Sequence, residues 1–275
     1  MKLRIATYNM HKGVSAFGRQ ARIHGMKEAL SSLDADLLFL QEVQGQHDNH
    51  AKKHPLWPNA GQHEFLAGES HHVAYGMNAV YAHGHHGNAL LSRYPIISLI
   101  NHDVSDHAYE QRGILHAVVQ VNTVAVHCFV IHLGLFAASR RRQVQALVNT
   151  IIRDTPVDSP VIIAGDFNDW NQRLSTTLYQ QLGVVEAFDA AEAAESAGNV
   201  IRQASVRAVL SDYLQPPRRI HARTFPAQFP WLCLDRVYLR GFRVQQALVM
   251  KGTPWNALSD HVPITVNLEM VERQI

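Results

Sequence analysis

The stretch VIIAGDFNDW at residues 161–170 decides how the whole sequence is interpreted, because a buried strand ends there among polar side chains. The run VIIA predicts a strand, since β-branched side chains pack well on a pleated sheet. The residues that follow it include Gly165, Asp166, Asn168 and Asp169. They are typical of a turn, and equally of an active-site rim, where loops on rigid strands carry chemistry. Polar residues at the ends of other strands would favour the active site.

The composition is typical of a globular protein. The chain has 275 residues, 47% of them hydrophobic, and a net charge of +2, which is far from the basic balance of a dedicated duplex-binding protein. The sequence contains no apolar run long enough for a transmembrane helix. Cys128 and Cys233 lie in apolar runs and are expected to be buried thiols rather than a disulfide. We therefore expect a cytoplasmic protein that is not integral to a membrane and has no obligate protein partner.

Strand-like and helix-like segments alternate in places and form hairpins in others. Strands are predicted at residues 3–9, 35–43, 88–96, 113–121, 124–133, 160–167, 231–239 and 263–270. Apolar residues at helical spacing predict helices at 20–33 and 138–153. We expect two mostly antiparallel sheets packed together with helices outside, within one domain spanning 1–275. The segment 190–219 is expected to be a partly helical insertion.

Most of the predicted strands present an acid, an amide or an imidazole near one end. These residues are Asn9, Glu42, His132, Asp166, Asn168, Asp235, Asp260 and His261. One such residue is commonly a satisfied polar group of the core. A buried carboxylate without a partner is costly, so these carboxylates are expected to have partners. Because polar residues occur at the ends of so many strands, the active-site interpretation is favoured over the turn.

The residue types in this set indicate a particular chemistry. Carboxylates and an asparagine amide are hard oxygen ligands that suit Mg²⁺ or Mn²⁺. Two histidines add donors for phosphate oxygens and a possible general acid or base. An aspartate paired with a histidine orients the ring and raises its basicity. Together these parts predict metal-assisted hydrolysis of a phosphate ester.

The motifs resemble those of the endonuclease/exonuclease/phosphatase (DNase I-like) superfamily along nearly the whole chain. The matching stretches are YN (8–9), LQEV (40–43), GNALLSRYPI (87–96), RGILHA (112–117), VIHLG (130–134), AGDFND (164–169), LDRVYL (234–239) and SDHVPI (259–264). The details are most similar to a bacterial subgroup that also has GHHGNA, GDFNDW and RTFPxQFP stretches. The resemblance implies a four-layer α/β-sandwich, with two mixed sheets face to face and helices outside.

The resemblance also implies a role for each matching residue. Metal binding is implied for Glu42, Asn9 and Asp260. Roles in catalysis are implied for Asp166, which would orient or deprotonate the attacking water, for Asn168, which would hold it, and for His132, His261 and Asp235 at the scissile phosphate. Phosphate binding is implied for Arg112 and Asn88. Which histidine is acid and which is base stays open.

Some positions depart from the family pattern. Some relatives carry an aspartate where this sequence has His11, so the metal site is expected to be softer or to hold one ion through fewer carboxylates. The phosphate-directed tyrosine of some nucleases has no clear equivalent, and Tyr94 and Tyr109 are candidates. The run Arg140–Arg142 is either a solvated helix face or a contact for an anionic substrate.

We therefore expect a phosphodiesterase that uses Mg²⁺ or Mn²⁺. Its substrate is a phosphate ester: a nucleic acid, a phospholipid or a small ester. One alternative is a non-catalytic module that binds phosphate or metal on the same fold. Another is a metal-binding protein built on the histidine-rich tract at 71–88, although this would leave the GDFN and SDH motifs unexplained.

Overall fold

Two six-stranded β-sheets form the centre of the fold. The structure, a computed structural model, describes residues 1–15, 20–107, 109–170, 173–202 and 222–271, with residues 195–202 described by their backbone only. The first sheet has the order β11 (Phe242–Val249), β12 (Ile264–Met270), β1 (Lys2–Asn9), β2 (Leu37–His47), β4 (Gly84–Ser92) and β3 (His72–Tyr81). The second has the order β5 (Ile96–Asp103), β6 (Gly113–Val121), β7 (Val124–His132), β8 (Val161–Asp166), β10 (Asp235–Arg240) and β9 (Val185–Glu186).

Both sheets are mixed. β1 and β2 run parallel in the first sheet and β7 and β8 in the second, whereas the other described strand pairs are antiparallel. The sheets pack face to face through buried apolar side chains, among them Phe39, Leu115 and Val130. The predicted arrangement of two mixed, facing sheets is confirmed.

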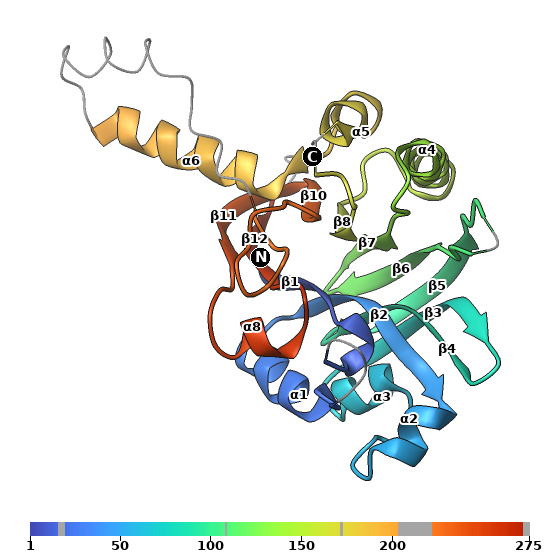
Figure 1. Cartoon of the computed structure of the whole chain (residues 1–275). Coiled ribbons are helices and arrows are strands. Elements are labelled where there is room, and N and C mark those ends of the chain that lie inside the picture. The colour runs from blue at the N-terminus through green and yellow to red at the C-terminus, as the bar shows by residue number, and fades with distance from the viewer. Residues whose placement is uncertain (16–19, 108, 171–172, 203–221, 272–275) are drawn as a thin grey trace.

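Helices cover the outer face of each sheet, which makes four layers (Figure 1). The helices on the side of the first sheet are α1 (Ile23–Ser32), α2 (Asp48–Lys53), α3 (Gln62–Ala67) and α8 (Trp255–Leu258); those on the side of the second are α4 (Ala137–Asp154) and α5 (Leu174–Leu182). Met26 and Trp255 enter the apolar layer of the first sheet, and Leu147 and Leu178 enter that of the second. The predicted four-layer α/β-sandwich is confirmed.

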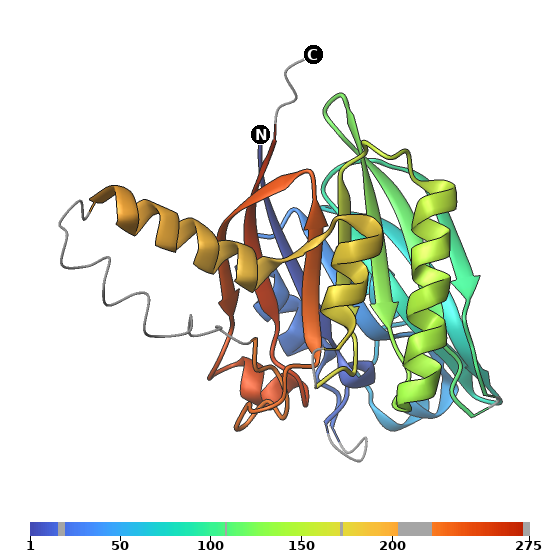
Figure 2. The same cartoon turned by 90° about the horizontal axis from the view of Figure 1, so that it is seen from above.

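Helix α6 (Ala187–Arg202) differs from the others in its position. Ala187 and Phe188 are buried in the core between the sheets, and from there the helix leads away from both sheets (Figure 2). The described part of the predicted insertion at 190–219 lies in this helix. Residues 203–219 of the insertion lie outside the described residues.

The strands that the sequence did not predict all lie at sheet edges. β3 and β11 are the two edges of the first sheet, and β5 and β9 are those of the second. An edge strand is paired on one side only and need not carry a buried apolar run; in β5 most side chains are exposed or half-buried. The prediction of one strand over 88–96 is wrong, since β4 ends at Ser92 and β5 begins at Ile96. The strand predicted from residue 231 begins only at Asp235.

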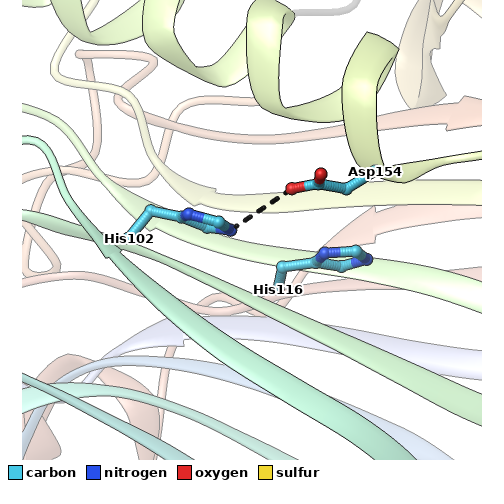
Figure 3. A group of neighbouring side chains, drawn as sticks. All are labelled: His102, His116 and Asp154. Carbon is cyan, nitrogen blue, oxygen red and sulfur yellow. Dashed lines mark ion pairs between the residues drawn. The ribbon is translucent and has the colours of Figure 1, made fainter.

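The layer between α4 and the second sheet contains a polar group. It consists of His102 of β5, His116 of β6 and Asp154, the last residue of α4 (Figure 3). His116 lies two residues after Ile114, so the two share a face of the sheet, and Ile114 packs in the apolar layer under α4. The group is therefore on the outer face, away from the core between the sheets.

Two further expectations concern the thiols and the membrane. Cys128 and Cys233 are both buried and free, as predicted. Among the helices in the described ranges, none is both long and apolar enough to cross a membrane.

Candidate active site

Gly165 determines the backbone conformation at the end of β8, next to the site. Its φ of +148° belongs to a region that is nearly restricted to glycine, and a Cβ there would lie 2.0 Å from the carbonyl oxygen of Ile131. This close approach belongs to the parallel pair β7–β8, whose register places His132 opposite Asp166. Glycine therefore allows the two strand ends to bring His132 and Asp166 together.

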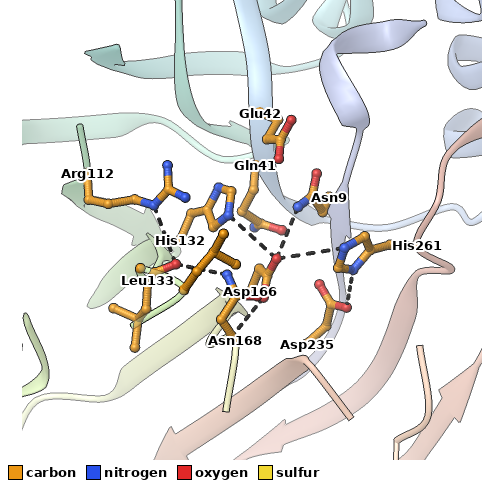
Figure 4. A network of polar contacts seen from close by, with 12 residues as sticks. Asn9, Gln41, Glu42, Arg112, His132, Leu133, Asp166, Asn168, Asp235 and His261 are labelled. Atoms are coloured by element: carbon orange, nitrogen blue, oxygen red, sulfur yellow. Dashed lines mark hydrogen bonds and ion pairs between the residues drawn. The ribbon is translucent and has the colours of Figure 1, made fainter. Parts of the chain in front are cut away.

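Asp166 is the centre of a buried polar network (Figure 4). Its Oδ2 accepts a hydrogen bond from Nδ2 of Asn9 at 3.1 Å. The same oxygen lies 3.6 Å from Nε2 of His132 and 3.8 Å from Nε2 of His261. Because Asn9 ends a strand of the first sheet and Asp166 a strand of the second, the network joins the two sheets.

Asn168 closes the turn after β8. Its φ of +50° is left-handed, a conformation that asparagine tolerates better than most residues. Its backbone N–H donates to Oδ1 of Asp166 at 2.9 Å, and its side-chain Nδ2 donates to the carbonyl oxygen of Leu133 at 2.9 Å. The turn thus holds the Asp166 carboxylate and the asparagine amide in one orientation.

His261 and Asp235 form a buried pair beside this network. Nδ1 of His261 lies 2.7 Å from Oδ2 of Asp235, and the ring of Phe225 packs against the imidazole with 5.0 Å between ring centroids. Oγ of Ser259 donates to the carbonyl oxygen of Asn9 at 2.7 Å, which ties the SDH segment to the end of β1. The structure places the aspartate and the histidine in direct contact, as the sequence predicts.

The three ionisable groups around the centre carry different charges near neutral pH. Burial would lower the pKa of His261, but the charge and hydrogen bond of Asp235 outweigh it and raise this pKa to about 10. Burial lowers the pKa of His132 well below its ordinary value. Burial also raises the pKa of Asp166 to about 6, despite the nearby charge of His261. Near pH 7 the site therefore holds a protonated His261, a neutral His132 and a largely ionised Asp166.

A β-bulge positions Glu42 at the rim. Gln41 and Glu42 of β2 lie opposite the single residue Asn88 of β4, and the φ of Glu42 is +54°. Such bulges redirect a side chain at the end of a strand. The Glu42 carboxylate lies beside Asn9 (Figure 4), and its Oε2 is 3.6 Å from Nζ of Lys12.

The 3₁₀ turn η1 (His11–Gly13) places basic side chains beside two carboxylates. Its three residues have φ values of +44°, +59° and +69°. Nδ1 of His11 lies 3.2 Å from Oδ2 of Asp260, and this contact raises the pKa of His11. Burial raises the pKa of Asp260, but the contact with His11 and the charge of His261 together outweigh burial, so the net shift is downward. His11, which departs from the aspartate implied by the family resemblance, therefore pairs with Asp260.

Arg112 and Asn88 are held by protein groups. Nη2 of Arg112 donates to Oε1 of Glu110 at 3.2 Å, and its Nε donates to the carbonyl oxygen of Leu133 at 3.4 Å. Nδ2 of Asn88 donates to the carbonyl oxygens of Gly113 and Val130 at 3.0 and 3.3 Å. Asn88 thus braces the second sheet from the first, next to the segment that carries Arg112.

The tyrosine candidates lie in different places. Ser92 pairs with Leu37 at the start of β2. Tyr94 follows Ser92, so it lies at the opposite end of these strands from Glu42. Of the two candidates, Tyr94 therefore does not lie beside Glu42. Tyr109 is fully exposed in the segment that leads to Arg112.

The arginines at the start of α4 do not form a simple solvated face. Arg140 is buried, with 6% of its surface exposed. Its Nη1 donates to the carbonyl oxygen of Gly134 at 3.2 Å, and its guanidinium lies over the ring of Trp170, 5.1 Å from the centroid. Nε of Arg142 donates to Oδ1 of Asp106 at 2.6 Å. Both side chains position loops next to the site.

The sequence analysis missed four neighbours of the site: Lys12, Gln41, His86 and Glu110. Gln41 has a buried Oε1 without a hydrogen-bond partner among the described residues. Burial and the charge of Lys12 are among the causes that lower the pKa of His86 to about 4. Gln41 and His86 lie within the stretches LQEV and GHHGNA, and Lys12 and Glu110 lie within three residues of Asn9 and Arg112. Proximity to a motif was therefore the available signal.

A cleft of about 610 Å³ opens beside the metal-binding candidates. Its lining includes His11, Arg22, Gln228, Ser259 and Asp260. Of the predicted metal-binding residues, Asp260 is the one that lines this cleft.

The family of the chain follows from comparison with known proteins. The model of the endonuclease/exonuclease/phosphatase family matches residues 6–261. The chain is 37% identical over 270 residues to "Uncharacterized protein YbhP" of Escherichia coli (strain K12), covering 97% of this chain and 96% of that relative. The relative of the same name in Shigella flexneri matches equally well. The protein belongs to the endonuclease/exonuclease/phosphatase family.

Solved structures share the fold at low sequence identity. An endonuclease/exonuclease/phosphatase from Bacteroides vulgatus has a TM-score of 0.72 at 14% identity, covering 98% of this chain and 100% of that one. A family member from Beutenbergia cavernae has a TM-score of 0.70 at 16% identity, covering 98% and 72%. D. rerio TDP2, complexed with a single-strand DNA product, has a TM-score of 0.66 at 17% identity, covering 98% and 99%.

Proposed function

We propose that the protein is a divalent-metal-dependent phosphodiesterase that hydrolyses a P–O bond by attack of water. The observation that carries this proposal is the single buried network in which Asp166 faces both His132 and the Asp235–His261 pair. It combines a group able to accept a proton with a protonated group able to stabilise negative charge. The proposal treats residues 1–275 as one domain of a cytoplasmic protein, which the buried free thiols support.

The donor set at the rim fits a hard divalent cation. Glu42, Asn9 and Asp260 offer two carboxylates and an amide oxygen, which are ligands suited to Mg²⁺ or Mn²⁺. Asp166, Asp235 and His261 also place ligand atoms within 4.8 Å of one another. Nδ1 of His261 is already held by Asp235 at 2.7 Å, and Nε2 of the same ring faces Asp166. We therefore assign the cation to Glu42, Asn9 and Asp260. Asp166, Asp235 and His261 are assigned to acid–base catalysis.

Each residue of the network has a task in this proposal. Asp166 accepts the proton of the attacking water, for which a pKa of about 6 is well suited. Asn168 orients that water, and the protonated His261 stabilises the charge that develops on the phosphate oxygens. When bound, the cation supplies further stabilisation of this charge. Arg112 and Asn88 support the phosphate-binding side of the pocket.

The cleft, the shared fold and the net charge suggest which phosphate esters to test. The cleft beside Asp260 leaves room for a group attached to the phosphate. TDP2, which shares the fold, was solved with single-strand DNA, so single-stranded DNA is one ester to test. The net charge of +2 provides no strong attraction for duplex DNA.

A hydrolysis screen with added Mg²⁺ or Mn²⁺ tests the proposal. The substrates are bis-p-nitrophenyl phosphate, abasic DNA, single-stranded DNA and phospholipid vesicles. We expect turnover of at least one ester that EDTA abolishes and Mg²⁺ or Mn²⁺ restores. Asp166→Asn should remove this turnover, whereas Glu28→Gln, which changes an exposed carboxylate on α1, should keep it. Binding without turnover on every ester would favour the non-catalytic module, and full activity in EDTA would contradict the role of the metal.

A further inference from the structure

The polar group between α4 and the second sheet lies outside the candidate active site. His102 and His116 stand on the neighbouring strands β5 and β6, and Asp154 ends α4 above them (Figure 3). One ligand atom of each of the three residues lies within 4.8 Å of those of the other two. Three separate segments of the chain thus direct metal-ligand atoms to one place.

Nε2 of His102 is buried close to Asp154 without forming a hydrogen bond. Its Nε2 is 3.7 Å from Oδ2 of Asp154, which is too long for a hydrogen bond. This buried Nε2 has no hydrogen-bond partner among the described residues. In a tetrahedral site with metal–ligand bonds of about 2.0–2.1 Å, ligand atoms lie about 3.3 Å apart. The two atoms are therefore close to the separation that a shared ion requires.

His116 is already oriented by a second histidine. Its Nε2 lies 3.0 Å from Nδ1 of His127 on β7, and its ring stacks on Phe129 with 4.2 Å between centroids. If Nε2 carries the proton and His127 accepts it, the lone pair of His116 Nδ1 is free. Ligating histidines commonly donate their other N–H to an acceptor in this way.

The charges at this place favour a cation. Burial lowers the pKa of His102 and lowers that of His116 to about 4, so both rings are neutral and able to ligate near pH 7. Asp154 adds a negative charge, and the C-terminal end of α4 adds the negative end of a helix dipole.

Arg153 competes for the same carboxylate. Its Nε and Nη2 donate to the two oxygens of Asp154, each at 2.6 Å. The arginine side chain is 64% exposed, so it can turn into solvent without loss of packing. Removing Arg153 should therefore leave Asp154 more available to an ion.

We propose that His102, His116 and Asp154 bind one transition-metal ion, Zn²⁺ in the first instance, with His127 accepting the N–H of His116. Two imidazoles and one carboxylate suit Zn²⁺ better than Mg²⁺, which separates this site from the oxygen-rich rim at Glu42. A water molecule completes the coordination. The ion joins the end of α4 to β5 and β6, so its role is structural.

Zn²⁺ binding and thermal unfolding, measured in excess Mg²⁺ so that the rim site is filled, test this proposal. We expect Zn²⁺ to raise the unfolding temperature of the wild-type protein, since an ion that binds only the folded state stabilises it. His102→Ala and Asp154→Asn should each weaken binding by at least about 100-fold and remove the shift. These two side chains are partly exposed, 19% and 22%, so their loss should not prevent folding.

Two further variants make the result specific. Arg153→Ala should bind Zn²⁺ more tightly than the wild type. His72→Ala, which removes an exposed histidine on β3, should bind Zn²⁺ as the wild type does. With Co²⁺ in place of Zn²⁺, the visible spectrum of a tetrahedral site should appear in the wild type and be lost in His102→Ala. Equal Zn²⁺ affinity and equal thermal shifts in wild type, His102→Ala and Asp154→Asn would overturn the proposal.

Discussion

Asp235 contributes most among the carboxylates that keep His261 charged. Asp235 and His261 are both nearly fully buried, and Oδ1 of Asp235 has no hydrogen-bond partner among the described residues. The imidazole is therefore the main compensation for a buried negative charge, which would otherwise cost several kcal/mol. Neither residue is expected to work without the other.

Asp235→Asn and His261→Ala should each lower the rate of phosphodiester hydrolysis by about 10²–10⁴. The double variant should be little worse than either single one, because residues that act as a unit are not additive. Steady-state kinetics on one ester, for all four proteins of the cycle, measures the coupling. Losses that multiply in the double variant would show that the two residues act separately.

The same pair predicts how stability changes with pH. The pKa of His261 is raised from 6.5 to about 10 in the folded state, so its contribution is fully present below pH 6.5 and is lost as the pH rises to about 10. The difference in free energy of unfolding between wild type and Asp235→Asn should therefore be largest below pH 6.5 and shrink toward pH 10. Urea unfolding across this range measures it. A difference that stays constant would contradict a protonated His261.

Several site residues could be found from the sequence because each lies in a motif at the end of an apolar run. Asn9, Asp166, Asp235 and His261 meet in the network. Lys12 and Glu110 could not be found in this way, because they are placed by a left-handed turn and a loop. Such conformations leave no apolar periodicity in the sequence.

At the level of elements, the pair β7–β8 is the one on which the site depends most. Gly165→Ala should cost about 3 kcal/mol or more, because it combines a glycine-only φ with a Cβ 2.0 Å from the Ile131 carbonyl oxygen. Gly183→Ala is the matched control: its φ is +65°, but a Cβ there meets nothing within 4 Å, so it should cost only about 1 kcal/mol. Chemical denaturation compares them, and equal costs would contradict a close approach at Gly165.

Helices α1 and α4 and most of the interior strands were predicted close to their observed bounds. β6, β7 and β8 carry buried side chains at most positions, and short apolar runs rich in β-branched residues favour a strand over a helix. β3, β5 and β11 carry mixed exposure along their length. Their position is determined by pairing with a neighbour and not by their own composition, so the sequence alone did not predict them.

For the whole molecule, binding of a divalent cation should be visible as stability. A cation that binds only the folded protein stabilises it by about 2.7 kcal/mol at about 100 times its Kd. We expect Mg²⁺ to raise the unfolding temperature of the wild type and EDTA to reverse the shift. Glu42→Gln should reduce the Mg²⁺ shift strongly, whereas Glu28→Gln should retain it. An undiminished shift in Glu42→Gln would place the cation elsewhere.

The pairing of β1 with β12 has a consequence for folding during synthesis on the ribosome. Asn9 is synthesised before Asp235 and His261, which follow it far along the sequence. β1 gains its antiparallel neighbour only after Ile264–Met270 has been synthesised, and contacts so distant in sequence form slowly. A nascent chain therefore carries the carboxylate of Asp166 for a long stretch of synthesis without the imidazole that faces it. The network can form only after His261 and β12 have been synthesised, so a nascent chain that lacks them should not show the proposed hydrolysis.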